Sequence, residues 1–189
     1  MENYARILSV FLGVGTIHSR IKIQKILYVL KSLGYPISEK YEYRHFGPYS
    51  EQLASELATS VNSGFLEEAE EGIASAPSDD FSDYQRYDLT LTERGRLFLQ
   101  SCLKKNPHLR AQSEAITALC RKLNQFSPTD LELIATLMYL QDQKTPENQL
   151  AVMLRNLKPK FGIAEANKAL QLISDLRSTA KPGTASLRQ

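Results

Sequence analysis

The beginning of the chain carries apolar residues at the spacing of helices. One helical face near the N-terminus holds Tyr4, Ile7, Leu8 and Phe11. A second helix is predicted from the N-cap Ser19 to about Leu33, and Gly34 ends it. At 100° per residue, its apolar stripe lies opposite a polar arc. That arc consists of Arg20, Gln24, Lys25, Tyr28 and Lys31.

The next segment is aromatic and extended, and a third helix follows it. Residues 41–46 are rich in aromatic side chains and predict a short extended stretch. Gly47-Pro48 then breaks the chain, and we expect it to start the third helix, because proline suits the first helical turn. The core face of this helix holds Leu53, Leu57 and Val61. Gly64 is the expected C-terminal stop.

A hairpin is predicted after the third helix. Phe65-Leu66 opens one strand, and residues 84–91 form a second strand with alternating apolar positions. Residues 67–83 lie between them and contain seven acids, Gly72 and Pro77, which favours a solvated hairpin tip. Thr92 is the expected N-cap of a further helix that runs to about Lys105.

The remainder of the chain is predicted to be helical. Expected helices span 109–124, 128–143 after the N-cap Ser127, a segment after Pro146, and 163–177. The helix 128–143 is apolar on nearly all sides, which indicates either a central helix or one shared with a second copy. Residues 179–189 are polar and are expected to be a disordered tail.

The order of these elements predicts a fold class. Three helices followed by a two-stranded hairpin are typical of a winged helix-turn-helix. We therefore predict a mainly α fold with a small β-hairpin: a winged-helix domain at 1–107, with its wing at about 65–91, and a C-terminal helical appendage at 108–178. Two isolated strands are barely stable in water, so the wing needs the support of the helices.

Charge is unevenly distributed along the chain. The 189 residues include 23 Lys+Arg and 21 Asp+Glu, for a net charge of +2. Residues 17–50 hold six bases and two acids (+4), 51–85 hold nine acids and no base (−9), and 86–124 hold eight bases and three acids (+5). Phosphate neutralisation supplies most of the non-specific affinity for DNA. The acidic block therefore disfavours DNA docking through the third helix and the wing.

The sequence contains no catalytic, nucleotide-binding or metal-binding motif. Three widely spaced histidines have no acid or cysteine at ligand spacing; they are His18, His45 and His108. Cys102 and Cys120 have apolar neighbours, which favours buried packing. The acids of residues 67–83 suit a solvated loop better than a catalytic carboxylate pair. We predict no enzymatic activity, no cofactor and no metal.

Hydropathy predicts a cytoplasmic protein with no membrane segment. The longest nearly apolar run, residues 7–15, is far shorter than the roughly 20 residues that span a bilayer. Its neighbours make a poor signal-peptide cleavage site, so a first core helix is the better interpretation.

Three segments resemble a known family. Lys22-Ile23-Gln24-Lys25-Ile26-Leu27-Tyr28-Val29-Leu30, Phe46-Gly47-Pro48-Tyr49-Ser50 and Gly64-Phe65-Leu66 are similar to the YwgA-like family of small bacterial proteins. The first segment also resembles the start of Panacea-type domains, which are associated with antitoxins. Residues 89–95 look like the strand-to-helix exit of winged-helix proteins. The resemblance, which covers about residues 1–105, implies a winged helix and assigns no activity to individual residues.

Residues 43–50 form a candidate interaction surface. Its members are Tyr43, Arg44, His45, Phe46, Tyr49 and Ser50. One interpretation is a recognition surface, because Arg and Tyr are favoured at binding hot spots. The other is a structural plug, in which aromatic side chains pin the segment between helices and Gly47-Pro48 fixes the turn. The sequence leaves both interpretations open.

Two functions follow from this pattern. The first hypothesis is a non-enzymatic regulatory or adaptor module that acts mainly through protein–protein contacts, antitoxin-like by analogy with Panacea-type domains. The alternative is a DNA-binding transcriptional regulator that uses the basic second helix instead of the acidic wing. Its candidate nucleic-acid contacts are Arg20, Lys22, Gln24, Lys25 and Lys31. The C-terminal helices are the expected interface of a homo-oligomer, and the acidic hairpin either faces a basic partner or is merely solvated.

Overall fold

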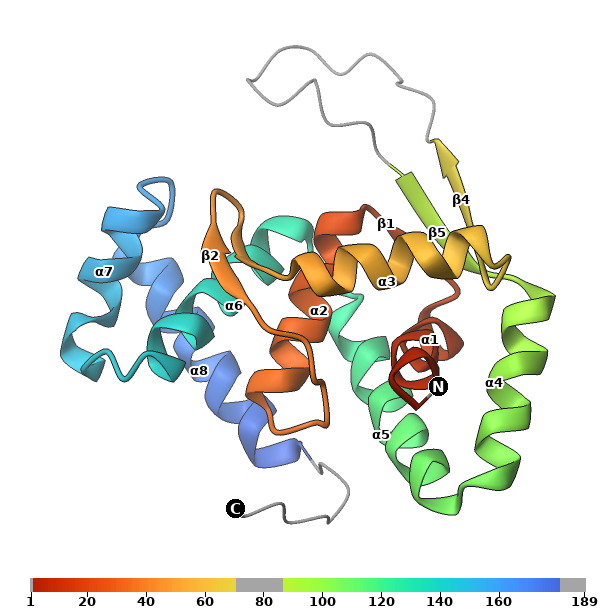
Figure 1. The fold of residues 1–189 in the computed structure, drawn as a ribbon. Coiled ribbons are helices and arrows are strands. Elements are labelled where there is room, and N and C mark those ends of the chain that lie inside the picture. The colour runs from red at the N-terminus through yellow and green to blue at the C-terminus, as the bar shows by residue number, and fades with distance from the viewer. Residues whose placement is uncertain (1, 71–86, 181–189) are drawn as a thin grey trace.

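The computed structural model describes residues 2–70 and 87–180 (Figure 1). This part of the chain is mainly helical with two small antiparallel sheets. The helices are α1 (Glu2–Val14), α2 (Arg20–Ser32), α3 (Glu51–Asn62), α4 (Glu93–Lys105), α5 (Pro107–Leu123), α6 (Pro128–Asp142), the short 3₁₀ helix η1 (Glu147–Gln149), α7 (Leu150–Leu157) and α8 (Ile163–Thr179). The strands are β1 (Thr16–His18), β2 (Glu42–Arg44), β3 (Gly47–Tyr49), β4 (Leu66–Glu70) and β5 (Tyr87–Leu91).

Side-chain caps begin the helices at the predicted places. Ser19, Thr92 and Ser127 each accept a hydrogen bond from a backbone N–H of the first turn. At Ser127 the Asp130 carboxylate also accepts from the Ser127 N–H, which completes a capping box. These signals are local, so the sequence alone locates them.

The start of the third helix was predicted incorrectly. Pro48 lies in β3, and α3 begins at Glu51 with Ser50 as its N-cap. The Ser50 Oγ accepts from the Leu53 N–H at 3.2 Å. Gly47 has a φ of 88°, in the left-handed region that glycine tolerates. Gly47 and Pro48 therefore belong to a hairpin between α2 and α3, and the helix starts only after it.

The larger sheet has a third strand that the sequence analysis missed. Its order is β1-β5-β4, all antiparallel, so β5 is the central strand. β1 pairs His18 with Asp88, and the His18 Nδ1 lies 2.9 Å from the Asp88 Oδ1. The predicted acidic hairpin tip and second strand include residues 71–86, which lie outside the described residues. The predicted tail includes residues 181–189, which lie outside them as well.

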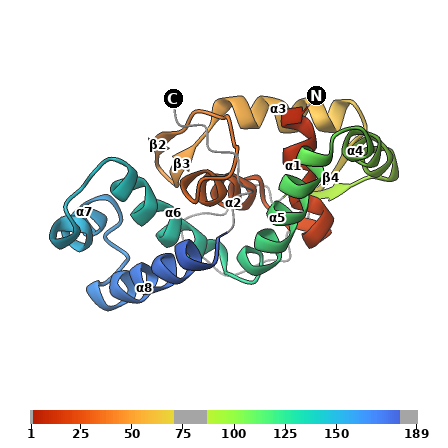
Figure 2. The same cartoon turned by 90° about the horizontal axis from the view of Figure 1, so that it is seen from below.

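The hydrophobic core continues across the expected domain boundary at residue 107. α5 packs along α1, and α6 packs along α2 (Figure 2). Between α1 and α5, the Ser9 and Ser113 hydroxyls lie 2.7 Å apart. A Cβ on Gly13 would lie only 2.6 Å from the Thr117 carbonyl oxygen, which shows how closely the two helices approach. The helices α5 and α6 therefore complete the core of the N-terminal elements, while α7 and α8 pack on the outer side of α6.

α6 is the central helix of this arrangement. Every residue from Leu131 to Met138 is buried. The neighbours that cover it are α2, α7, α8 and β3. Of the two predicted explanations for its apolar surplus, coverage by the chain itself is the one observed. The surplus on this helix therefore gives no support to self-association.

Candidate interaction surface

The predicted interaction surface is a short hairpin supported by two helices. In the β2–β3 pair, Tyr43 faces Pro48 and Arg44 faces Gly47. β3 packs against α2 and α6 (Figure 2). Because an isolated two-stranded hairpin is marginal in water, its conformation depends on these two helices.

The six predicted surface residues divide between exterior and interior. Arg44 and His45 are exposed and Ser50 is buried. The half-buried members are Tyr43, Phe46 and Tyr49. The hairpin thus combines the two interpretations: one side serves as a structural plug, and the other presents polar and aromatic groups to solvent.

The exposed side of the hairpin is ordered by charge and ring contacts. The Arg44 Nη1 lies 2.5 Å from the Glu51 Oε1, and its guanidinium carbon lies 4.7 Å from the centroid of the Tyr49 ring. The rings of His45 and Phe46 meet edge to face, with centroids 4.7 Å apart. Surface ion pairs of this kind contribute little to stability. They hold Arg44 of β2 against Tyr49 of β3 and the first residue of α3, Glu51.

The predicted nucleic-acid contacts on α2 are mostly buried, which corrects the expected polar arc. Lys22, Gln24 and Lys25 are all buried. The physical reason is that α2 is enclosed by α6, by β3 and by the sheet, so its polar side is covered as well as its apolar stripe. The remaining two candidates are Arg20, which is exposed, and Lys31, which is half-buried.

The cationic side chains of α2 bond to the protein itself. The Lys22 Nζ donates to the Asn124 carbonyl at 3.0 Å, and the Lys31 Nζ donates to the Ile37 carbonyl at 2.9 Å. The guanidinium of Arg20 binds both carboxylate oxygens of Glu68 on β4, at 2.6 and 2.5 Å. The basic residues of this helix therefore tie it to its own surroundings.

Gln24 fixes the end of the hairpin through the main chain of Ser50. The Gln24 Nε2 donates to the Ser50 carbonyl at 2.9 Å, and the Ser50 N–H donates to the Gln24 Oε1 at 2.9 Å. The side-chain amide thus pairs with the backbone as a neighbouring strand would. Both groups are buried, so each would be left without a partner if this amide were lost.

Lys25 fixes the turn of the hairpin. Its side chain is 1% exposed, and the Nζ donates to the Pro48 carbonyl at 2.7 Å. A Cβ on Gly47 would lie 3.2 Å from the Thr136 Oγ1 and 3.7 Å from the Lys25 Nζ. Lys25, Thr136 and the left-handed φ of Gly47 together explain why glycine occupies this position.

A second lysine, next to the end of α7, reaches the same hairpin. The Lys158 Nζ donates to the His45 carbonyl and lies 2.5 Å from the Glu132 Oε1. The Lys160 Nζ donates to the Glu132 Oε2 at 2.7 Å. Burial raises the pKa of Glu132, but Lys158 and Lys160 outweigh it, so that the pKa is lowered overall. The carboxylate thus bridges α6 to the loop after α7.

Aromatic side chains fill the space under the hairpin. Tyr28 lies against Tyr41 and Tyr139, with ring centroids 5.0 and 6.1 Å away, and Tyr43 lies 5.2 Å from Tyr139. The Tyr28 hydroxyl donates to the Asp142 carboxylate at 2.7 Å. This cluster joins α2, the hairpin and α6, as the plug interpretation expects.

The sequence analysis missed the most exposed apolar residues. Four of the five exposed large hydrophobic side chains in the described residues lie on α7 and at the start of α8. We call them the apolar arm; its residues are Val152, Met153, Leu157 and Ile163. The exposed fractions reach 61% at Val152 and 58% at Ile163. The sequence does contain a signal for this exposure. Six of the eight residues of α7 are apolar, which is more than its contacts with α6 and α8 bury.

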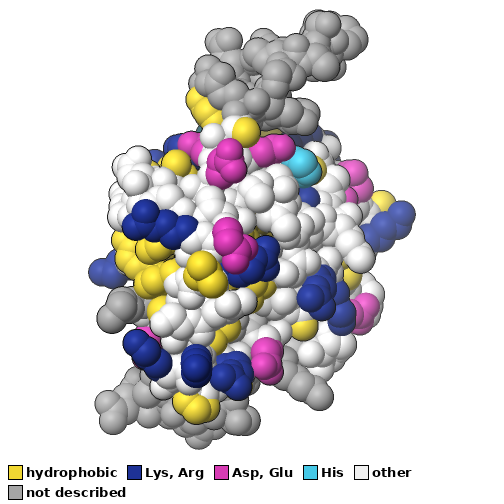
Figure 3. All heavy atoms as spheres, turned by 90° about the vertical axis from the view of Figure 1, so that its right-hand side faces the viewer, with side chains coloured by type: hydrophobic (Ala, Val, Ile, Leu, Met, Phe, Trp, Pro, Cys, Tyr) yellow, Lys and Arg dark blue, Asp and Glu magenta, His cyan; other side chains and the backbone are white. Residues whose placement is uncertain are grey.

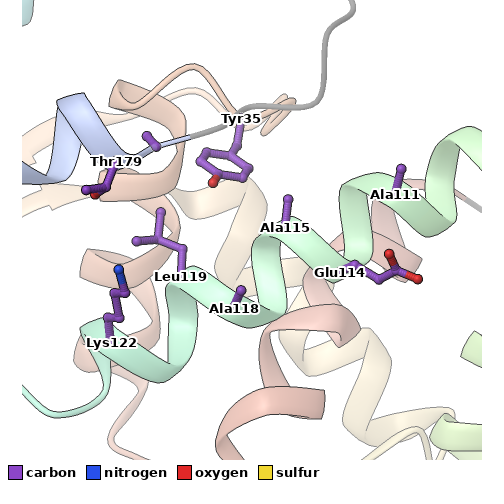
Figure 4. Close-up of a pocket in the computed structure, with 9 residues that line it drawn as sticks. Tyr35, Ala111, Glu114, Ala115, Ala118, Leu119, Lys122 and Thr179 are labelled. Carbon is purple, nitrogen blue, oxygen red and sulfur yellow. The ribbon is translucent and has the colours of Figure 1, made fainter.

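A shallow hollow of about 420 Å³ lies between α5 and the end of α8 (Figure 4). Figure 4 shows small side chains of α5 along it, with Tyr35 and Thr179 on the opposite side. Its ionisable side chains besides Tyr35 are Glu114 and Lys122. The residues that line this hollow do not include a nucleophile with an adjacent base, which covalent catalysis would require.

The described residues contain no group of three or more His, Cys, Asp or Glu arranged to hold a metal ion. Cys120 is buried and Cys102 is partly buried, both as free thiols. Burial raises the pKa of the Cys120 thiol, which makes it a packing residue and not a reactive one. Within the described ranges, no helix is both long and apolar enough to cross a membrane.

The stability of the fold is expected to depend on pH through Lys25. Burial lowers its pKa from 10.5 to about 7, with Glu132 acting against this and Lys158 adding to it. Between these two values the folded chain binds fewer protons than the unfolded chain, so the free energy of unfolding rises with pH. The rise in the free energy of unfolding amounts to at most about 1.4 kcal/mol per pH unit. The Lys25→Met substitution should remove it.

Urea unfolding of the wild type, Lys25→Met and the exposed control Lys40→Met, from about pH 7 to pH 9, measures this effect. Lys40→Met should follow the wild type. A wild type and Lys25→Met whose free energies change in parallel over this range would contradict the role given to Lys25.

Comparison with known proteins places the chain in a family. No protein-family model matches it. The uncharacterized protein YwgA of Bacillus subtilis (strain 168) is 30% identical over 177 residues, which cover 94% of this chain and 98% of YwgA. Alignment over almost the whole of both chains includes the helices after residue 107, which the resemblance noted in the sequence did not cover well. The chain therefore belongs to the YwgA family.

Proposed function

We propose that the protein is a non-enzymatic regulatory or adaptor module that works through protein–protein contacts on a winged-helix framework. The order α1-β1-α2-α3-β4-β5, with a three-stranded antiparallel sheet, supports the winged-helix part of the proposal. The connection between α2 and α3 departs from a simple helix-turn-helix, where three or four residues suffice. Here residues 33–50 join them and include the β2–β3 hairpin.

One observation carries the proposal: the cations that DNA docking would need are bonded inside the protein. Lys22, Lys25 and Lys31 all donate to main-chain carbonyls. The exposed residues of α3 include no lysine or arginine; they are Glu51, Gln52, Ser55, Thr59 and Asn62. Neutralisation of phosphates supplies most non-specific DNA affinity, and neither helix offers it.

The apolar arm supports contact with another protein. Exposed apolar side chains that are scattered singly are normal, whereas a local group of them is typical of interaction sites. Lys158 connects the end of α7 to the hairpin, so the arm lies next to the segment that contains His45 and Phe46. We propose that the partner places an apolar segment on the arm. An antitoxin-like role is one form of this proposal, by analogy with Panacea-type domains.

A DNA-binding regulator is the second candidate, and the face that contains α4 favours it. α4 and the start of α5 carry exposed cations, namely Arg94, Arg96, Lys104, Lys105 and Arg110. Figure 3 shows Lys and Arg side chains over the middle and lower part of this face. DNA would have to use this face and not α2, whose lysines donate to carbonyl groups of the chain.

The protein-contact proposal predicts that the arm determines which proteins accompany this one. Tagged wild type, the double variant Val152→Asp/Leu157→Asp and the control Leu97→Asp are purified from the cells that naturally contain the protein. Leu97 is a matched control because it is 58% exposed on α4, away from the arm. The wild type and Leu97→Asp should retain the same co-purified protein in stoichiometric amount. The double variant should retain at least tenfold less of that protein.

The proteins bound are quantified by mass spectrometry after equal loading, and circular dichroism checks that each variant is folded. An unchanged set of partners in the double variant, or no stoichiometric partner for the wild type, would overturn this part of the proposal.

The same proposal predicts weak binding to DNA. Fluorescence anisotropy with a mixed-sequence duplex at physiological salt should show no dissociation constant tighter than the roughly 10⁻⁴–10⁻⁶ M that is typical of non-specific binding. The charge-reversal variant Arg96→Glu/Lys104→Glu/Lys105→Glu tests the α4 face. Tight binding by the wild type that this variant abolishes would favour the DNA-binding regulator instead.

A further inference from the structure

The buried Glu39 and the half-buried Glu56 meet where three segments of the chain converge. The Asn3 Nδ2 on α1 donates to the Glu56 Oε1 on α3 at 2.8 Å and to the Glu39 Oε1 at 3.2 Å. Glu39 lies in the connection between α2 and β2. Ser38, next to it, donates to the Asn3 Oδ1 at 3.1 Å. One amide nitrogen thus holds both carboxyl groups at the same point of the fold.

The pair lacks a neutralising cation. Glu39 has no exposed surface, and within the described residues neither it nor Glu56 forms an ion pair with a lysine, an arginine or a histidine. The Oε2 atoms of both carboxyl groups are buried without a hydrogen-bond partner, and so is the Tyr41 hydroxyl. A buried and a half-buried carboxylate at this point would repel each other, and burial also penalises each charge.

The electrostatics of the neighbours agree with this geometry. Burial raises the pKa of Glu56, and the Glu39 carboxyl raises it further, while hydrogen bonds from Gln52 and Asn3 act in the opposite direction. Burial also raises the pKa of Tyr41 well above its ordinary value, with Glu39 and Glu56 both contributing. The groups that act on Glu56 are therefore Glu39 and Asn3 on the packed segments and Gln52 on its own helix.

We propose that Glu56 keeps its proton and shares it in a hydrogen bond to the Glu39 carboxylate, and that this pair acts as a pH-sensitive latch between α1, the connection to β2, and α3. With the proton in place, one carboxyl group donates to the other and the pair carries a single negative charge. When the proton leaves for solvent, two negative charges face each other, and the three segments separate more readily. This inference goes beyond the proposed function and does not depend on it.

The sign of the pH effect follows from the shared proton. The folded protein retains this proton at pH values where a glutamate in the unfolded chain has lost it. Its contribution to stability is therefore complete below the ordinary glutamate pKa of 4.5 and is lost as the pH rises through the folded value. In that window the equilibrium constant of unfolding increases by up to about tenfold per pH unit.

Urea unfolding from about pH 4.5 to pH 8 tests the latch with matched variants. Glu56→Gln removes the group that holds the proton, and Glu39→Gln removes the neighbouring carboxylate; each substitution introduces an amide of the same shape, so both should lose the rise in the unfolding constant and exceed the wild type in stability at pH 8. The control Glu114→Gln, at an exposed position on α5, should keep it. Hydrogen exchange should show that the amides of residues 6–9, which donate to the carbonyl groups of the first turn of α1, open faster at pH 8 than at pH 5 in the wild type but not in Glu56→Gln, after correction for intrinsic exchange rates.

The result that overturns the proposal is a wild type and a Glu56→Gln whose unfolding constants change in parallel with pH. The Glu39→Gln variant provides the same comparison if Glu56→Gln fails to fold. A repeat at pH 8 with millimolar Mg²⁺ or Ca²⁺ separates a proton from a metal. Stabilisation of the wild type but not of the variants by either ion would show a cation site and would also overturn the shared proton.

Discussion

The bonds from Gln24 and Lys25 to the main chain of residues 48–50 are the interactions on which the rest of this structure depends. A hairpin of two three-residue strands cannot hold its shape in water by itself. Gln24 supplies it with a donor and an acceptor, and Lys25 supplies a donor to the Pro48 carbonyl. The hairpin fills the connection between α2 and α3 and ends at the N-cap of α3. The position of α3 therefore follows from two polar side chains on α2.

This arrangement changes what the charge pattern of the chain means. Residues 17–50 carry a net +4, which in the sequence predicts a basic surface for a partner. In the structure, its lysines on α2 donate to carbonyl groups of the chain, and Arg20 binds Glu68. Buried cations of this kind position their surroundings more than they attract a ligand. A group of exposed cations lies instead on α4 and the start of α5, while four of the five exposed large apolar side chains in the described residues lie on α7 and at the start of α8.

The features that the sequence predicted are those with local causes. Ser19, Thr92 and Ser127 cap helices through groups within a few residues, so pattern alone located them. The features it missed depend on contacts between distant residues. β1 is three residues long and becomes a strand only because β5 lies beside it. Gly47-Pro48 has the composition of a helix start, but its conformation is decided by Lys25, more than twenty residues earlier.

Burial of polar residues explains the errors in the candidate site. A helical wheel places Gln24 and Lys25 opposite the apolar stripe, and nothing in residue type shows that β3 covers them. The signal that was available is the apolar density of residues 21–30, which exceeds one face of a helix. The Asn3–Glu39–Glu56 cluster had no signal at all, because its members are 36 and 53 positions from Asn3.

Hydrogen exchange at the Ser50 amide tests the central claim most directly. This N–H donates to the Gln24 side chain and not to a strand or helix partner, so its protection reports the support that α2 gives to the hairpin. The account predicts strong protection in the wild type and a loss of at least tenfold in Gln24→Leu, while the buried amide of Leu27 on α2 keeps most of its protection. A Ser50 amide that exchanges as fast as an unstructured one in the wild type, or that is equally protected in Gln24→Leu, would contradict it.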